Sequence, residues 1–133
     1  MLAILGSGFG LYGYLPALIV GCEQRIVLPE RCRAHFVERP ELKYFSDNIQ
    51  WEQDEITALG CADAVVLALR PTVQREWISR CLERMNIDRL LLEKPLAQSP
   101  ETAARVFDDL INAGRIFRIG YTFRFTGWGK QVL

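Results

Sequence analysis

Short apolar runs recur along the chain and are separated by segments of helical spacing. Short strands are predicted at 2–5, 25–28, 64–69 and 89–92, and the continuous apolar run at 64–69 is typical of a strand that is buried on both faces of a parallel sheet. A weaker strand is expected at 49–51. The alternating sequence RIFRIGYTFRF predicts a final strand. The chain therefore supplies six candidate strands.

Apolar residues at helical spacing predict the connections between these strands. A first helix follows a glycine-rich segment and is expected to stop at Gly21. DEITALGCAD predicts a short helix, and 72–85 predicts a longer amphipathic one. Residues 99–101, SPE, supply an N-cap, a first-position proline and an acidic first turn for a helix that ends at 112–114. Strands alternating with helices predict a doubly wound α/β fold, a mostly parallel six-stranded Rossmann sheet.

The amino-acid composition argues against some classes of binding partner. With 133 residues the chain fits one domain, and 16 basic residues balance 16 acidic ones. A neutral chain without a basic run is not expected to bind nucleic acid. No apolar run approaches the roughly 20 residues that span a bilayer, and no secretory signal is recognisable, so we expect a cytoplasmic protein that does not bind membranes.

The cysteines do not suggest a metal site. Cys22, Cys32, Cys61 and Cys81 are widely spaced, and His35 is the only histidine. Zinc sites use closely spaced pairs of such ligands, so free thiols and no metal are expected.

The segment LAILGSGFGLYGYLPAL fits the spacing Gly-x-Gly-x-x-Gly in two registers. One is imperfect, at positions 6, 8 and 11, and the other is complete, at 8, 10 and 13. The imperfect register is preferred, because Gly6 follows the strand at once, whereas the other delays the helix until Tyr14. A turn of this kind directs backbone N–H groups and a helix N-terminus at a pyrophosphate. The predicted phosphate turn consists of Gly6, Ser7, Gly8, Phe9, Gly10 and Leu11.

Leu11 replaces the third glycine of the motif, which usually lets helix and strand pack closely. Gly10 is expected to relieve that crowding. A glycine turn between strand and helix also occurs for purely structural reasons, so the motif alone does not identify a ligand.

Other unusual residues follow the remaining strands. In an open parallel sheet, ligands bind beyond the carboxyl ends of the strands, where the strand order reverses. The candidates at that edge are Glu30 and Arg31 after the second strand, Leu69, Arg70 and Gln74 after the fourth, and Glu93 and Lys94 after the fifth.

Four motifs, GSGFGLYGYLPAL, ADAVVLALRPTVQREWI, LLLEKPLAQSPETA and RIGYTFRF, occur in this order. Together they resemble the N-terminal domain of the glucose-fructose oxidoreductase, inositol dehydrogenase and rhizopine-catabolism (Gfo/Idh/MocA) family. The resemblance implies an NAD- or NADP-dependent oxidoreductase of sugars or polyols. It also implies a Rossmann domain over 1–125 and, at 126–133, the start of a connection to a second domain that this sequence lacks.

The resemblance further implies roles for the EKP segment. Lys94 would lie near the reacting carbon and assist proton transfer, and Glu93 would orient Lys94 or bind the cofactor. It also suggests a cis peptide between Lys94 and Pro95. Gln74 stands where the family commonly has histidine, and Leu69 replaces a smaller residue in a loop that contacts the cofactor.

Two positions leave alternatives open. Glu30 could accept from a ribose 2′-hydroxyl and favour NAD, whereas Arg31 or Arg33 could pair with a 2′-phosphate and favour NADP, which we prefer. Arg70 could reach a phosphate or pair with Glu93.

The predicted function is therefore nicotinamide dinucleotide binding, without turnover by this chain alone because the substrate domain is missing. An alternative is a non-catalytic module that has lost the cofactor and oligomerises, as a homodimer, through the exposed edge of the sheet. A methyltransferase also uses a glycine turn after its first strand, but it leaves EKP unexplained.

Overall fold

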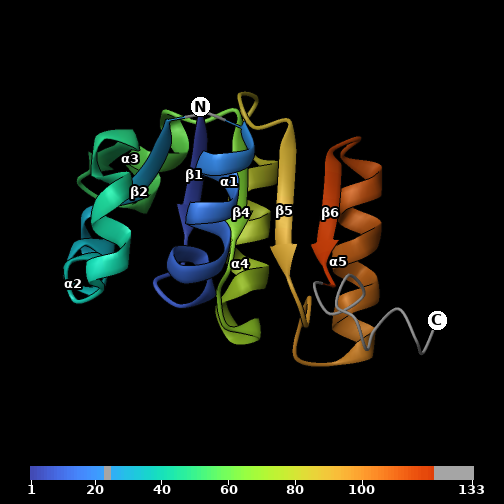
Figure 1. The fold of residues 1–133 in the computed structure, drawn as a ribbon. Helices are drawn as coiled ribbons and strands as arrows, with labels where there is room; N and C mark the ends of the chain where they lie inside the picture. The colour runs from blue at the N-terminus through green and yellow to red at the C-terminus, as the bar shows by residue number, and fades with distance from the viewer. Residues whose placement is uncertain (23–24, 122–133) are drawn as a thin grey trace.

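Six parallel strands form a single sheet. The computed structural model describes residues 1–22 and 25–121, and the strands are β1 (Leu2–Leu5), β2 (Ile26–Pro29), β3 (Ile49–Glu52), β4 (Ala64–Leu67), β5 (Arg89–Glu93) and β6 (Ile116–Gly120). Their order is β3-β2-β1-β4-β5-β6, and every pair is parallel (Figure 1). The predicted doubly wound Rossmann sheet is confirmed. The chain reverses its direction of travel across the sheet between β1 and β4, so this is the switch point at which such folds bind ligands.

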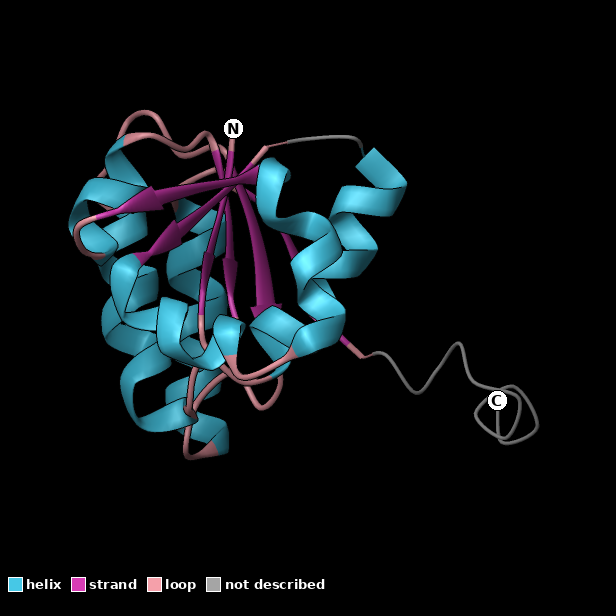
Figure 2. Cartoon of the chain, turned by 60° about the vertical axis from the view of Figure 1, so that its left-hand side comes forward, coloured by secondary structure: helices cyan, strands magenta, loops and turns pink. Residues whose placement is uncertain are grey.

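Helices cover both faces of this sheet (Figure 2). The α-helices are α1 (Leu15–Cys22), α2 (Arg33–Val37), α3 (Glu55–Gly60), α4 (Pro71–Leu82) and α5 (Pro100–Asn112). A π-helical turn, η1 (Gly10–Tyr14), leads directly into α1, and two 3-10 segments, η2 (Glu30–Cys32) and η3 (Pro40–Asn48), flank α2. The first helix thus begins several residues before Tyr14.

Local capping sets several helix ends. Ser99 accepts a hydrogen bond of 3.2 Å from the Thr102 amide at the start of α5, as predicted. Asp54 accepts one of 2.8 Å from the Thr57 amide at the start of α3, and this donor holds the pKa of the Asp54 carboxyl below its usual value. Gly114, with φ +64°, follows the end of α5.

Two sequence predictions differ from the structure. Gly21 lies inside α1 and does not end it, because a glycine stops a helix only where the backbone turns left-handed. The last strand ends at Gly120, earlier than the alternating sequence indicated. The remaining residues of that prediction, 122–125, lie outside the described part of the chain, as does the expected connection at 126–133.

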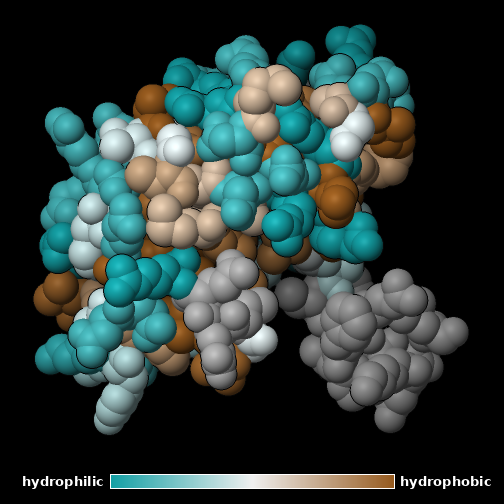
Figure 3. Space-filling view, turned by 90° about the horizontal axis from the view of Figure 1, so that it is seen from above, coloured by the Kyte–Doolittle hydropathy of each residue, from teal (hydrophilic) through white to brown (hydrophobic). Residues whose placement is uncertain are grey.

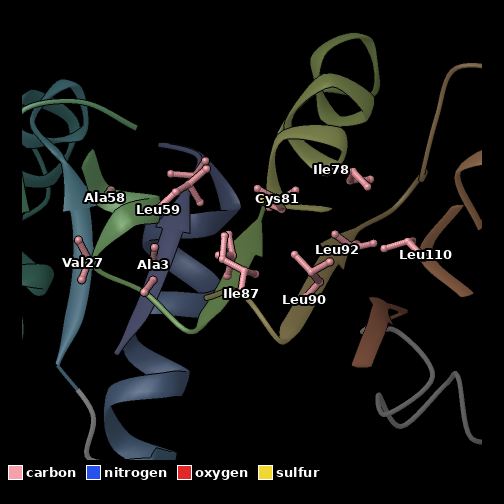
Figure 4. Packing of buried hydrophobic residues seen from close by; sticks show 14 of the residues in the cluster. Ala3, Val27, Ala58, Leu59, Ile78, Cys81, Ile87, Leu90, Leu92 and Leu110 are labelled. Atoms are coloured by element: carbon pink, nitrogen blue, oxygen red, sulfur yellow. The ribbon is translucent and has the colours of Figure 1, made fainter. Parts of the chain in front are cut away.

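The core is divided by the sheet into two clusters. One face packs against α3, α4 and α5, and Figure 4 shows Ile78, Leu92 and Leu110 meeting there from α4, β5 and α5. The other face packs against η1, α1, α2 and η3. These buried side chains fix the strand ends and therefore the edge that carries the candidate site.

Helix α1 leaves part of its face of the sheet uncovered beside β5 and β6. A shallow hollow of about 390 Å³ lies there and is lined by residues that include Leu18, Leu91 and Arg118. Figure 3 views the molecule from the edge at which the strands begin, and hydrophilic side chains cover much of the described surface there. Within the described residues, no helix has both the length and the apolar character needed to cross a bilayer.

Candidate functional site

The turn after β1 requires glycine at its first position. Gly6 has φ +137°, and a Cβ atom added there would lie 2.2 Å from the carbonyl oxygen of Ala68, beside β4. Gly10 is also tightly packed, since its added Cβ would lie 3.0 Å from Ile4 Cγ2. Glycine at these two positions lets the turn and the first helix approach the ends of β1 and β4.

Gly8 has a different environment, because no atom lies within 4 Å of the place its Cβ would occupy. Its carbonyl accepts hydrogen bonds from the amides of Leu11, at 3.0 Å, and Tyr12, at 3.3 Å, as the helix begins. Among the described residues, the amides of Ser7 and Gly8 donate no hydrogen bond. This geometry agrees with the 6, 8, 11 register and leaves free donors at an open helix N-terminus.

The side chains of this turn pack inward around the helix start. Leu11 is fully buried in the core cluster that includes the buried side chains of α1. Phe9 is half-buried, and its ring meets the ring of Tyr14 edge-on, with centroids 5.0 Å apart. Gly13 is small because the Phe9 ring lies against it, 2.6 Å from an added Cβ.

The EKP segment lies at the carboxyl end of β5. The peptide between Lys94 and Pro95 is cis, which confirms the prediction, and the Lys94 side chain is exposed. The Tyr14 hydroxyl donates a hydrogen bond of 2.7 Å to Oε2 of Glu93, and the Lys94 amide donates one of 3.1 Å to Oε1. Burial, together with the Glu93 carboxylate, raises the pKa of Tyr14, so its hydroxyl stays protonated.

Gln74 supports the same segment from beneath. Its side chain is fully buried, and Nε2 donates to the carbonyl oxygens of Glu93, at 2.7 Å, Pro95, at 3.3 Å, and Leu96, at 3.4 Å. A direct cofactor contact by Gln74 stays a prediction, whereas its hold on this main chain is observed.

Leu69 and Arg70 connect β4 to α4. Leu69 is half-buried and packs against the core under α4, and Arg70 is exposed at the N-cap of that helix. Within the described residues no ion pair joins Arg70 to Glu93, whose carboxylate is engaged by Tyr14 and the Lys94 amide. Of the two alternatives for Arg70, the pairing with Glu93 is not formed in this structure, and contact with a phosphate stays a prediction.

The charged residues after β2 are already paired. Glu30 accepts from Arg33, including one hydrogen bond of 2.9 Å from Nη2, and this lowers the pKa of the Glu30 carboxyl. Arg31 pairs with Glu55. The Arg33 guanidinium also lies over the Trp51 ring, 4.3 Å from its centroid.

The parallel sheet brings the glycine turn, Arg70, Glu93 and Lys94 to one edge, around the ends of β1, β4 and β5. Sequence reasoning missed Tyr14 and Gly120, which contact one another across the sheet. In the sequence, Tyr14 is one more residue of an apolar helix, and no local motif distinguishes Tyr14 or Gly120 from its neighbours. In the part of the chain that the structure describes, no three His, Cys, Asp or Glu side chains gather as a metal ion would require.

Comparison with known proteins identifies the family. A family model described as oxidoreductase family, NAD-binding Rossmann fold, GFO_IDH_MocA, matches residues 3–121. The chain belongs to this family, which confirms the resemblance and the expectation of a nicotinamide dinucleotide cofactor at the level of the family. No curated protein matches the sequence.

Solved structures share the fold at low sequence identity. KijD10, a 3-ketoreductase from Actinomadura kijaniata solved with NADP and TDP-benzene, is 20% identical with a TM-score of 0.77, over 98% of this chain and 40% of that one. The WlbA dehydrogenase from Chromobactrium violaceum, solved with NADH and UDP-GlcNAcA, is 16% identical with a TM-score of 0.72, over 93% and 35%. UDP-N-acetylglucosamine 3-dehydrogenase GnnA from Acidithiobacillus ferrooxidans is 15% identical with a TM-score of 0.74, over 98% and 41%. The chain thus spans about two fifths of the length of these proteins.

Proposed function

We propose that this chain binds NADP or NAD at the carboxyl edge of its sheet, with the pyrophosphate on the turn from Gly6 to Leu11. The observation that carries the proposal is Gly8, where free backbone amides meet open space at the start of a helix. Such a cradle fits diphosphate oxygens in size and in polarity. The chain belongs to a family with an NAD-binding Rossmann fold, so a nicotinamide dinucleotide is the ligand we propose for this geometry.

The dinucleotide, when bound, supplies hydride transfer. Lys94 is exposed at the same edge, and its ammonium would donate a hydrogen bond to the cofactor ribose or to a substrate hydroxyl. Sugars or polyols are the proposed substrate class, in keeping with the sugar nucleotides in the names of the structures above. We expect no turnover by this chain alone, because residues of a second domain would supply the substrate pocket.

The choice between NADP and NAD depends on the tip of β2. We favour NADP, because Arg33 is exposed and its ion pair with the half-exposed Glu30 is of the kind that is energetically weak, whereas Arg31 pairs with the largely buried Glu55. A 2′-phosphate would then replace the Glu30 carboxylate as the partner of Arg33. Similar folds have been solved with either form, since KijD10 holds NADP and WlbA holds NADH.

Calorimetric titration with NAD, NADH, NADP and NADPH tests the proposal. We expect weak binding, tightest for the 2′-phosphate forms. Gly8→Asp is the matched variant, because a Cβ added at this position meets no atom within 4 Å and the carboxylate would carry negative charge beside the proposed pyrophosphate site. It should keep its melting temperature and lose about tenfold or more in affinity, which is about 1.4 kcal/mol. Heat signals absent for all four dinucleotides would contradict the proposal.

A second proposal, association of two copies, has its own observation. Strand β6 is an edge of the sheet, Ile116 on it is 60% exposed, and the hollow beside β5 and β6 is partly apolar. Exposed sheet edges favour pairing between chains. Sedimentation should show a homodimer, and a monodisperse monomer at high concentration would count against it. A cytoplasmic location likewise remains a prediction.

A further inference from the structure

The first helix and the EKP segment are joined by one partly buried hydrogen bond. Tyr14 is 8% exposed, and its hydroxyl reaches Glu93, which is 79 residues away in the sequence. A hydroxyl in such a place is costly unless it has a partner, and here the partner is a carboxylate, which accepts strongly. The bond therefore connects the element that begins at the glycine turn to the residue before Lys94.

Gly120 provides the space for this hydroxyl. A Cβ atom added at Gly120 would lie 2.1 Å from the Tyr14 hydroxyl oxygen, whereas the next nearest atoms, Oε2 of Glu93 and the carbonyl oxygen of Leu92, would both be 3.5 Å away. Among these atoms, only the Tyr14 hydroxyl oxygen would overlap a side chain at position 120. The absence of a side chain at Gly120 therefore leaves room for this oxygen at the end of β6.

We propose that Tyr14 is a positioning residue for Lys94, acting through Glu93. Tyr14 holds one oxygen of the Glu93 carboxylate, and the other oxygen accepts from the Lys94 amide. Both oxygens are then engaged within the protein, so Glu93 orients the segment. This inference rests on the proposed function only in giving Lys94 a cofactor or substrate to meet.

Two independent contacts fix the same short segment. Tyr14 holds the side chain of Glu93, and Gln74 holds its main-chain carbonyl from the opposite side of the chain. Without the hydroxyl, the Glu93 carboxylate is free to rotate toward the Lys94 ammonium and to draw it away from the nicotinamide end of the ligand. The loss should therefore affect the nicotinamide end of the ligand more than the adenosine end.

The Lys94 amide proton reports this arrangement without any ligand. In a ¹⁵N-resolved NMR spectrum of the wild-type chain, its resonance reports the hydrogen bond to the Glu93 carboxylate. Tyr14→Phe should shift the resonance and speed up its hydrogen exchange about tenfold, as expected for losing a bond to a fixed charge. The Thr57 amide, bonded to the remote Asp54 cap, serves as the control. An unchanged Lys94 amide would overturn the inference.

The shape of the site is tested by rescue. Gly120→Ala should lower the melting temperature, because its methyl group overlaps the Tyr14 hydroxyl. The double variant Tyr14→Phe/Gly120→Ala should recover most of that loss, since the overlapping atom is gone. A double variant no more stable than Gly120→Ala would overturn the fit between Gly120 and Tyr14.

Ligand affinity separates positioning from a general structural role. Tyr14→Phe should weaken NADPH binding about fivefold and leave binding of 2′-phospho-ADP-ribose, which lacks nicotinamide, within about twofold. Equal weakening of both ligands would overturn the positioning role. If the wild-type chain binds neither ligand, the proposed function fails, and the Lys94 amide still decides the role of Tyr14.

Discussion

The EKP segment and the tip of β2 lie on the same edge of the sheet but are held in different ways. Glu93 is tied to Tyr14 and to Gln74 by contacts that span 79 and 19 residues of sequence. Glu30 is tied to Arg33, three residues away, and both side chains are about half exposed. Glu93 is thus held by tertiary contacts, whereas Glu30 is held by a local ion pair in solvent.

This difference indicates which part of the candidate site is held in place before a ligand binds. Buried bonds to a carboxylate and to carbonyl oxygens are costly to break, whereas exposed ion pairs contribute little and exchange partners easily. The segment around Glu93 is therefore held firmly, and the exposed Glu30–Arg33 pair at the tip of β2 is adaptable. Cofactor discrimination can change at the tip of β2 without disturbing the region around Lys94.

The largest effect is expected in the glycine turn that adjoins the rigid region. Gly6→Ala should destabilise the protein by about 3 kcal/mol or more, because its Cβ meets a backbone oxygen and its φ is unfavourable for alanine. Gly8→Ala, with open space around its Cβ, should stay within about 0.5 kcal/mol of the wild type. Urea unfolding of both variants measures the difference. Similar losses for the two would show that the turn is uniformly tight.

A smaller loss is expected beneath the EKP segment. Gln74→Leu removes the donor that satisfies buried carbonyl oxygens and should cost about 1 to 3 kcal/mol of the unfolding free energy. Arg75→Ala, at the exposed neighbouring position, is the control and should change it by less than about 0.5 kcal/mol. The midpoints of denaturant unfolding, compared at a constant m-value, measure the two losses. Equal losses for Gln74→Leu and Arg75→Ala would contradict a specific role of Gln74 beneath the EKP segment.

The smallest effect is expected at the tip of β2 and depends on pH. Because Arg33 lowers the pKa of Glu30 in the folded protein, this pair stabilises the fold above the ordinary Glu pKa of about 4.5, and its contribution is lost as the pH falls through the lower folded value. Arg33→Ala should return the pKa of Glu30 toward its ordinary value and flatten the acid side of the stability curve slightly. The carboxyl shift of Glu30, followed by NMR against pH, measures this directly. A Glu30 titration unaffected by the substitution would show that the pair is not formed in solution.

Local chemistry explains what could be predicted. Ser99 and the following proline mark the start of α5, apolar runs mark the strands, and Gly6 follows β1 at once. The positions of Arg70, Glu93 and Lys94 at one edge follow from parallel strands alone. Of the two alternatives for Arg70, the pairing with Glu93 is not formed among the described residues, where Tyr14 and the Lys94 amide donate to that carboxylate.

By itself the sequence determined the strands, the helix caps, the glycine turn and the edge that carries the candidate site, since each depends on residues close together in the chain. The tertiary structure alone decided that Tyr14 reaches Glu93, that Gly120 leaves room for its hydroxyl, and that Gln74 lies beneath Lys94. These contacts join segments far apart in sequence. They exist because packing of α1 and α4 on opposite faces of the sheet places the side chains within hydrogen-bonding distance.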